Sequence, residues 1–122
     1  LDLLVNLLPL TTTTRGLLNR ELFGHLAQGA ALINCGRGEH LVEADLLDAL
    51  ASGRLRGALL DVFASEPLHR DSPLWQAPGV WITPHMASAA SDACIARQIA
   101  DNLQRLRAGL PLNYQVDPEL GY

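Results

Sequence analysis

Three side chains with complementary chemistry follow apolar stretches of the sequence: Arg37, Glu66 and His85. A guanidinium offers a planar fork that matches a carboxylate group. An imidazole can hand a proton to a developing alkoxide, and a carboxylate beside it favours the imidazolium and fixes the ring. These are the parts needed to reduce a 2-oxo acid to a 2-hydroxy acid, provided that a nicotinamide supplies the hydride.

The elements that must position these residues alternate along the chain. Apolar segments typical of strands alternate with segments that carry leucine or isoleucine at helical spacing. This alternation predicts an α/β fold, with a parallel sheet flanked by helices and a first strand that is buried on both faces. The segment 65–79 is expected to be a loop with one helical turn. Strands are expected at 1–8, 30–34, 57–63 and 80–83, and helices at 19–29 (capped by Asn19), 43–52 and 91–109 (capped by Ser91).

The carboxyl ends of parallel strands meet at one edge of the sheet, where ligands of open α/β sheets bind. Arg37 follows the second strand, Asp61 and Glu66 follow the third, and His85 follows the fourth. Each has an ordinary explanation on its own: a surface cation, a loop cap, a turn residue or a structural histidine. The joint placement favours a site made of Arg37, Glu66 and His85, and the glycines around Arg37 permit close approach of the backbone to a ligand. For Asp61, the loop cap stays open as an alternative.

The cysteines and the other histidines carry no recognisable motif. Cys35 and Cys94 have no CxxC spacing, so reduced thiols are expected, with Cys35 as a packing residue. His25, His40 and His69 are expected on helix or loop surfaces without a role in the site. The sequence has no cysteine or histidine array typical of a metal site and no GxSxG motif typical of a hydrolase.

Composition narrows the class of protein. The chain has 122 residues, 48% of them hydrophobic and 18% charged, with a net charge of −4, which is typical of a folded domain and lacks the basic footprint of a nucleic-acid binder. The apolar run at residues 1–10 is too short to cross a membrane and lacks the features of a signal peptide. We therefore expect a cytoplasmic protein with neither nucleic acid nor membrane as a partner.

Four segments resemble, in order, the carboxyl-terminal half of the D-isomer-specific 2-hydroxyacid dehydrogenases. They are VNLLPLTTTTRGLLNRELF, ALINCGRGEHLVEADLLDAL, GALLDVFASEPL and VWITPHMAS, and they contain the ordered set GRG, DVF-x-x-EP and TPH. The ending LPLNYQVDPELGY resembles the glyoxylate/hydroxypyruvate reductase branch. The resemblance implies that residues 1–110 are the second half of a Rossmann-like NAD(P)-binding domain and that residues 111–122 are the family's carboxyl-terminal tail.

The resemblance also implies roles for individual residues. Arg37 would bind the substrate carboxylate and carbonyl, His85 would donate the proton, and Glu66 would be its partner. Asp61 would hold the carboxamide of the nicotinamide. The cofactor would be NAD or NADP, with NADPH favoured. The residues lining its binding site would be Leu8, Pro9, Cys35, Gly36, Arg37, Asp61, His85, Ala87 and Ser88.

Parts of the family pattern do not occur in these 122 residues. There is no GxGxxG phosphate loop after a strand and no separate substrate-binding domain. We therefore expect a piece of a longer homodimeric reductase that acts on a small 2-oxo or 2-hydroxy acid, such as glyoxylate or hydroxypyruvate, and is poorly active alone. Two alternatives stay open: a cofactor-binding regulatory module that resembles the corepressors of this family, and an inactive half-domain held together by dimerisation.

Overall fold

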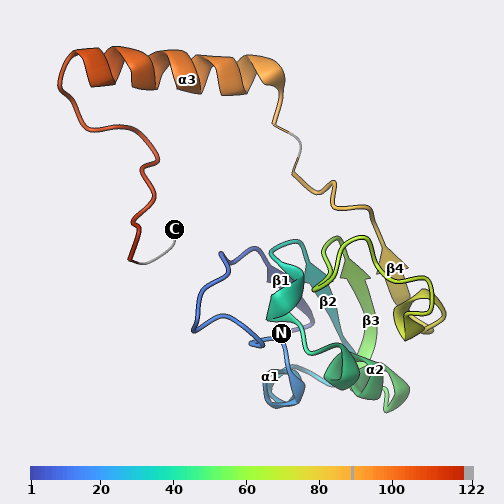
Figure 1. Ribbon diagram of the computed structural model, residues 1–122. Coiled ribbons are helices and arrows are strands. Elements are labelled where there is room, and N and C mark those ends of the chain that lie inside the picture. Colours follow the sequence, from blue (N-terminus) through green and yellow to red (C-terminus); the bar gives the residue numbers. More distant parts are fainter. Residues whose placement is uncertain (89, 120–122) are drawn as a thin grey trace. The chain divides into compact units, whose positions relative to one another are not determined.

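A sheet of four parallel strands is the centre of the first compact unit of the chain (Figure 1). This computed structural model describes residues 1–88 and 90–119, and its two units are Leu1–Ala87 and Ser88–Tyr122. The strands lie in sequence order and every neighbouring pair is parallel, as the alternation of segments predicts. Their bounds are Leu3–Asn6 (β1), Ala30–Asn34 (β2), Leu55–Leu60 (β3) and Val80–Ile82 (β4).

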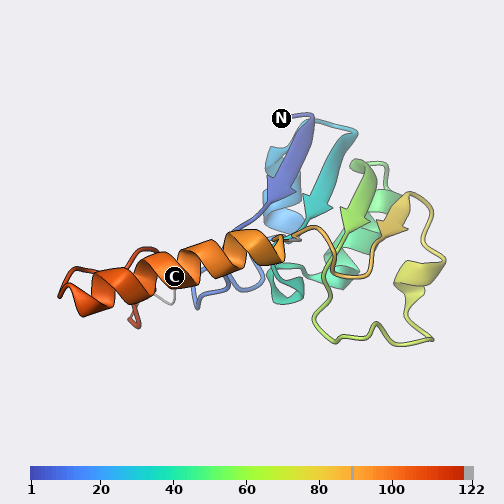
Figure 2. The same ribbon diagram turned by 90° about the horizontal axis from the view of Figure 1, so that it is seen from above.

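Helices connect the strands of this unit, and one long helix forms most of the second unit. Right-handed crossovers between adjacent parallel strands place successive helices on the same face of the sheet, which Figure 2 shows for the first two helices. The bounds are Arg20–His25 (α1), Glu43–Ala51 (α2) and Asp92–Arg107 (α3), with 3-10 helices at Gly38–His40 (η1) and Pro73–Trp75 (η2). The second of these is the single helical turn expected in the loop 65–79.

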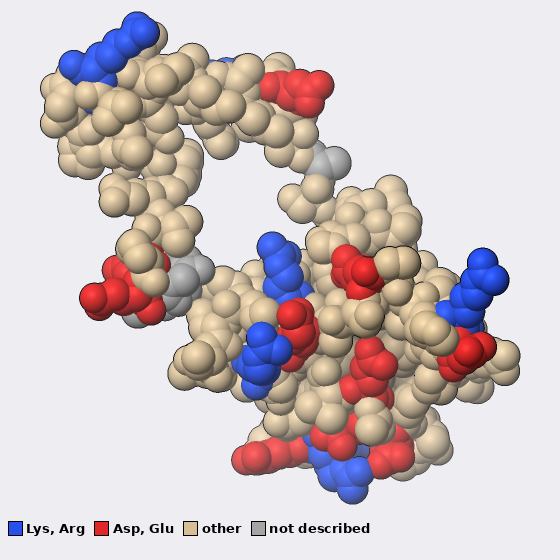
Figure 3. Space-filling model, viewed as in Figure 1, with Lys and Arg blue, Asp and Glu red and all other residues tan. Residues whose placement is uncertain are grey.

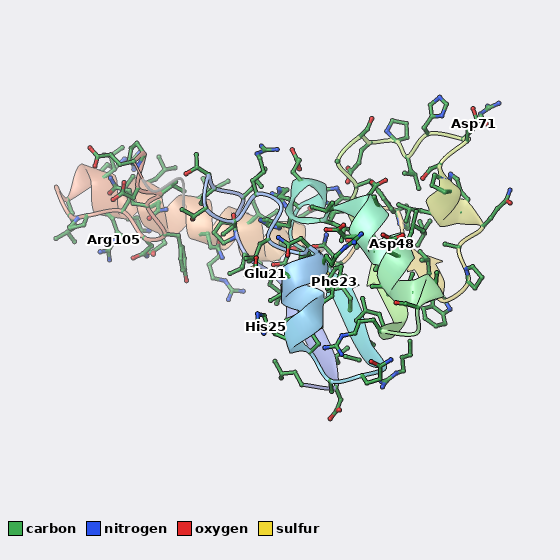
Figure 4. The ribbon with its side chains drawn as sticks, turned by 90° about the horizontal axis from the view of Figure 1, so that it is seen from below. Glu21, Phe23, His25, Asp48, Asp71 and Arg105 are labelled. Atoms are coloured by element: carbon green, nitrogen blue, oxygen red, sulfur yellow. The ribbon has the colours of Figure 1, made fainter. Side chains whose placement is uncertain are left out.

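The hydrophobic core lies between the helices and the sheet face that they cover. Phe23 of α1 and Leu46 of α2 are buried in one cluster with Leu32 of β2 and Leu60 of β3. Figure 4 shows Phe23 on the side of α1 that faces the strands, whereas His25 is exposed. This packing fixes the strands to the helices and with them the loops at the carboxyl edge of the sheet.

The expectation that the first strand is buried on both faces is wrong. Leu3 and Val5 of β1 are 46% and 47% exposed, while Asn6 is buried. The reason is that α1 and α2 cover one face only. On the other face Val5 pairs with Ile33, and Trp81 of β4 is exposed as well.

Several element boundaries differ from the expected ones: β1 is shorter at both ends, and β3 ends at Leu60 rather than at residue 63. The third strand begins at Leu55, because Leu55 pairs with Ala30 before the register shifts at Ala31. Helix α1 ends at His25 rather than near Gly29. The side chain of Arg54, which lies outside this helix, caps its carboxyl end. Arg54 donates to the carbonyl oxygens of Phe23 (2.8 Å), Gly24 and Leu26 (2.5 Å).

The caps at Asn19 and Ser91 are confirmed. Asn19 accepts the N–H of Leu22 at 3.1 Å, and Ser91 accepts the N–H of Cys94 at 3.3 Å. The two compact units divide between Ala87 and Ser88, and no described residue of α3 is buried. That residues 88–110 serve the NAD(P)-binding domain stays a prediction, and residues 120–122 of the predicted tail lie outside the described residues. None of the helices in the described ranges has both the length and the apolar character that crossing a membrane requires.

Candidate active site

His85 and Glu66, which the sequence places 19 residues apart, are in direct contact. Nδ1 of His85 lies 2.8 Å from Oε2 of Glu66, and Oε1 of Glu66 accepts the N–H of Phe63 at 2.9 Å. The hydrogen bond from His85 and then that from Phe63 lower the pKa of Glu66 below its ordinary value, against the effects of burial and of the Asp61 charge. Glu66 is therefore a carboxylate that orients the ring and leaves Nε2 as the atom able to act on a ligand.

The turn that carries His85 is held by the buried carboxylate of Asp61. Oδ1 of Asp61 accepts the Thr83 hydroxyl at 2.5 Å and the Met86 N–H at 2.9 Å, and Oδ2 accepts the Ala87 N–H at 2.8 Å. Burial acts to raise the pKa of Asp61, but the hydrogen bonds from Thr83, Met86 and Ala87, together with the His85 charge, lower it below its ordinary value. The carboxylate thus remains ionised and holds the chain on both sides of the histidine.

His85 itself adopts a conformation that side chains other than glycine seldom take. Its φ is 52°, in the left-handed region, and its N–H bonds to the carbonyl oxygen of Thr83 at 3.1 Å. Such a conformation persists only where the surroundings determine it. The three donors that bond to Asp61 provide that constraint, which fits the loop cap considered for this residue.

Arg37 lies at the same edge, on the loop between β2 and η1, but it is not joined to the other two residues. Its side chain is exposed, and Nη1 donates to the carbonyl oxygen of Gly36 at 2.8 Å. Among the described residues, no hydrogen bond or ion pair connects Arg37 to Glu66 or His85. The guanidinium therefore faces solvent with Nε and Nη2 available for an anion.

Gly36 and Gly38, beside Arg37, were expected to allow the close approach of a ligand, but the structure shows another reason for glycine at these positions. A Cβ on Gly36 would lie 2.7 Å from Nδ2 of Asn6 and 2.9 Å from Nδ1 of His40. A Cβ on Gly38 would lie 1.8 Å from the carbonyl carbon of Phe63. The space beside both glycines is thus filled by this chain, and the close approach that they allow is one between protein segments.

The other residues expected to line a cofactor lie at or next to this edge. Leu8 is 44% exposed and Cys35 is half-buried. The pKa of the Cys35 thiol is raised, first by burial and then by the charge of Asp61, so it is protonated at neutral pH and suits packing rather than nucleophilic attack. Ala87 ends the first compact unit and Ser88 begins the second.

One histidine expected on a surface is completely buried. His40 has no exposed area, and it contacts the buried side chain of Asn6, which in turn bonds to the buried Asn34. The alternation of the strands could have indicated this cluster, because Asn6 shares a face with Leu4 and Asn34 shares one with the buried Leu32. No local signal marks His40, whose burial depends on the turn of η1.

A cavity of about 440 Å³ borders the His85–Glu66 pair and is lined mainly by apolar side chains, among them Phe63, Trp75 and Ile82. Figure 3 shows that arginine and carboxylate side chains are interspersed on the face of the first unit in that view.

Comparison with known proteins decides the family. Residues 1–87 match the family described as "D-isomer specific 2-hydroxyacid dehydrogenase, NAD binding domain". The chain belongs to this family. Its parallel sheet with helices is the dehydrogenase NAD-binding architecture that the sequence predicts.

Several proteins are similar to this chain over almost its full length. Glyoxylate/hydroxypyruvate reductase A of Serratia proteamaculans is 52% identical over 121 residues, which are 99% of this chain and 39% of that protein. A D-isomer specific 2-hydroxyacid dehydrogenase from Xanthobacter autotrophicus, solved with NADPH and MES, has a TM-score of 0.93 and 49% identity over 99% of this chain and 50% of that one. An NADPH-dependent glyoxylate/hydroxypyruvate reductase from Sinorhizobium meliloti, solved with NADP and sulfate, has a TM-score of 0.91 and 46% identity over 99% and 40%. The chain thus spans about two fifths of the length of its curated relatives.

Proposed function

We propose that this chain supplies the proton donor and the substrate-binding arginine of an NAD(P)H-dependent reductase that converts a small 2-oxo acid, such as glyoxylate or hydroxypyruvate, into the 2-hydroxy acid. The observation that carries the proposal is the His85–Glu66 contact of 2.8 Å at the carboxyl edge of a parallel sheet. The names of the Serratia and Sinorhizobium relatives support the substrate class.

A nicotinamide cofactor suits the chemistry of this edge. The loop after β1 exposes Leu7 and Leu8, and the turn after His85 exposes Met86, so apolar side chains are available to pack against a flat ring. Leu8, Pro9, Cys35, Gly36 and the 85–88 turn would hold the nicotinamide end, whereas the chain has no GxGxxG loop for the pyrophosphate. NADPH is favoured by the relatives solved with NADPH or NADP. When bound, the reduced nicotinamide supplies the hydride that adds to C2 of the oxo acid.

Arg37 would bind the substrate. Its exposed guanidinium keeps Nε and Nη2 free for two parallel hydrogen bonds to a carboxylate, while Nη1 is held by the carbonyl oxygen of Gly36. A short side chain and a carboxylate next to the carbonyl are the features that such a fork can recognise. Binding by Arg37 orients the carbonyl carbon and withdraws electron density from it.

His85 would give its Nε2 proton to the carbonyl oxygen. As C2 gains the hydride, the electron pair of the C=O bond moves to oxygen, which takes this proton and becomes the hydroxyl of the product. Glu66 holds Nδ1–H and compensates the positive charge of the imidazolium before transfer. The neutral imidazole then takes a new proton from water, since His85 is half exposed.

Two further assignments belong to this proposal. The longer protein is proposed to be a homodimer. A cytoplasmic location is supported by the two unpaired cysteines, Cys35 and Cys94.

A fusion tests the function directly. In this Serratia fusion, the chain replaces the matching 121-residue region of the Serratia proteamaculans relative. The oxidation of NADPH is followed with glyoxylate and with hydroxypyruvate, in the fusion and in its Arg37→Ala and His85→Ala variants, with Arg70→Ala and His69→Ala as matched controls in an exposed loop. Activity that requires Arg37 and His85 but not the controls supports the proposal. Activity that survives both replacements contradicts it, and cofactor binding without reduction would favour the regulatory module.

A further inference from the structure

Three buried polar side chains, those of Asn6, Asn34 and His40, form a cluster beneath the loops that follow β1 and β2. Their exposed fractions are 4%, 0% and 0%. Nδ2 of Asn6 donates to Oδ1 of Asn34 and approaches Nδ1 of His40, both at 2.8 Å. Burying polar groups is unfavourable unless they are bonded, so a cluster that only filled space would be better replaced by apolar residues.

The bonds of the cluster are mutually consistent and fix the form of His40. Oδ1 of Asn6 accepts the Leu8 N–H at 3.3 Å, which sets the amide so that Nδ2 points at the imidazole. Nδ1 of His40 therefore accepts, both from Asn6 and from the Arg37 N–H at 3.2 Å. Nε2 of His40 lies 3.2 Å from the carbonyl oxygen of Pro9, and an N–H there donates to it. The ring thus carries its hydrogen on Nε2.

This single ring connects the two loops that serve the proposed site. On one side it bonds to the backbone of Arg37, whose carbonyl oxygen also accepts Nδ2 of Asn34 at 3.3 Å. On the other side it bonds to Pro9, next to Leu8. Gly36 allows the arrangement, because a Cβ there would collide with both Asn6 and His40.

We propose that His40 is a positioning residue that sets the Arg37 loop and the Leu8–Pro9 loop relative to each other. It does not touch the substrate: its ring is fully buried, and its nitrogens bond to other residues of the chain. The inference rests on the proposed function, since it assigns His40 an effect on oxo acid binding through Arg37 and on cofactor binding through Pro9.

Two conservative variants separate the two sides of the ring. In His40→Asn, the amide oxygen takes about the place of Nδ1, so the acceptor for Asn6 and Arg37 is kept and the bond to Pro9 is lost. In His40→Gln, the amide nitrogen takes about the place of Nε2, so the bond to Pro9 is kept and the acceptor is lost. His25→Asn and His25→Gln, at an exposed position of α1, are matched controls.

Steady-state kinetics of the Serratia fusion test whether the two variants affect the KM for glyoxylate and the KM for NADPH differently. Loss of a buried hydrogen bond corresponds to about a tenfold change in an apparent binding constant. We expect His40→Gln to raise the KM for glyoxylate by about tenfold with a smaller effect on the KM for NADPH, and His40→Asn to do the reverse. Equal KM values in both variants, or a loss of kcat alone as from a smaller folded fraction, would overturn the positioning role.

The tautomer offers a second measurement that does not depend on catalysis. ¹⁵N NMR of the 122-residue chain should show His40 with an unprotonated Nδ1 and a protonated Nε2. A hydrogen on Nδ1 would overturn the inference. An inactive unsubstituted fusion whose His40 has the expected tautomer would instead count against the proposed function, so the two failures are distinguishable.

Discussion

Nδ1 of His85 lies 2.8 Å from Oε2 of Glu66, and the second oxygen of this carboxylate is held by the N–H of Phe63 at 2.9 Å. The carboxylate is thus fixed from both sides, by the residue it orients and by the backbone after β3. This arrangement gives the imidazole one free nitrogen and a fixed direction, which is what a proton donor at the carboxyl edge of the sheet requires.

Removal of the imidazole should raise the pKa of Glu66. The bond from His85 is the largest influence that lowers this pKa, so His85→Ala should return it toward the ordinary value while the bond from Phe63 limits the change. The carboxyl carbon of Glu66 can be followed by ¹³C NMR during an acid titration of the 122-residue chain. A pKa of Glu66 that is unchanged in His85→Ala would contradict the contact, and His69→Ala serves as the control.

The charge of Glu66 should matter for turnover. Glu66→Gln keeps one oxygen that can accept from Nδ1 of His85, while its NH₂ would face the N–H of Phe63, and it no longer compensates an imidazolium. General acid catalysis raises the reaction rate by about 100- to 10,000-fold, and Glu66→Gln should lose part of this rate enhancement. We therefore expect kcat of the Serratia fusion to fall by about 10- to 100-fold. The KM for glyoxylate should change little, because Glu66 is not expected to contact the substrate. A large rise in KM at constant kcat would assign Glu66 to binding instead.

Arg37 should act mainly through binding. Arg37→Lys keeps the positive charge but loses the planar fork, and hydrogen bonds to charged groups contribute about 1.5 to 3 kcal/mol each. We expect the KM for glyoxylate to rise by about 10- to 100-fold in the fusion. Arg70→Lys, in the exposed loop before η2, is the matched control. A KM for glyoxylate that matches that of the control would exclude a bidentate contact.

Local sequence patterns, namely the spacing of hydrophobic residues and the helix caps, predicted most of the strands and helices. Hydrophobic spacing and caps were enough for β2, for the Ser91 cap of α3 and for the parallel order of the sheet. The end of α1 could not be predicted in this way, because Arg54, some 30 residues away, takes the carbonyl oxygens at its carboxyl end. Exposure of β1 could not be predicted either, since it depends on which faces the helices cover.

For the site, the motifs predicted candidate residues, whose catalytic roles stay predictions, and the topology predicted the sheet edge that they share. What they left out was the support beneath it. Asp61 was expected to hold a nicotinamide carboxamide, yet both of its oxygens bond to the turn of His85, and the carboxamide contact stays a prediction. In the cluster around His40, strand alternation could have placed Asn6 and Asn34 on the buried face, but no local pattern indicates their contact with His40, which is 34 positions from Asn6.

Gly38 and Gly24 form a matched pair for the role of glycine near the site. A Cβ on Gly38 would meet backbone atoms of Phe63 and Ala64, which cannot rotate away, whereas a Cβ on Gly24 meets nothing within 4 Å. We expect Gly38→Ala to lower the free energy of unfolding by about 1 to 3 kcal/mol or more through overpacking. Gly24→Ala, in helix α1, should raise it by up to about 1 kcal/mol. Urea unfolding of the 122-residue chain measures both, and equal stability of the two variants would contradict the packing of Gly38 against Phe63.

Asp61 should make stability depend on pH at the acid end. Its pKa is lower in the folded chain than in the unfolded chain, so its contribution is fully present above the unfolded value of about 3.9 and is lost as the pH falls through the lower folded value. In Asp61→Asn this part of the pH dependence should vanish, and the unfolding free energy near neutral pH should fall, because an amide NH₂ would face an N–H of Met86 or Ala87.

Asp71→Asn, at an exposed loop position, is the control. Unfolding by urea, followed from neutral pH to below pH about 3, gives both quantities. The same acid slope in Asp61→Asn and in the unsubstituted chain would show that the carboxylate does not hold the His85 turn in its ionised form.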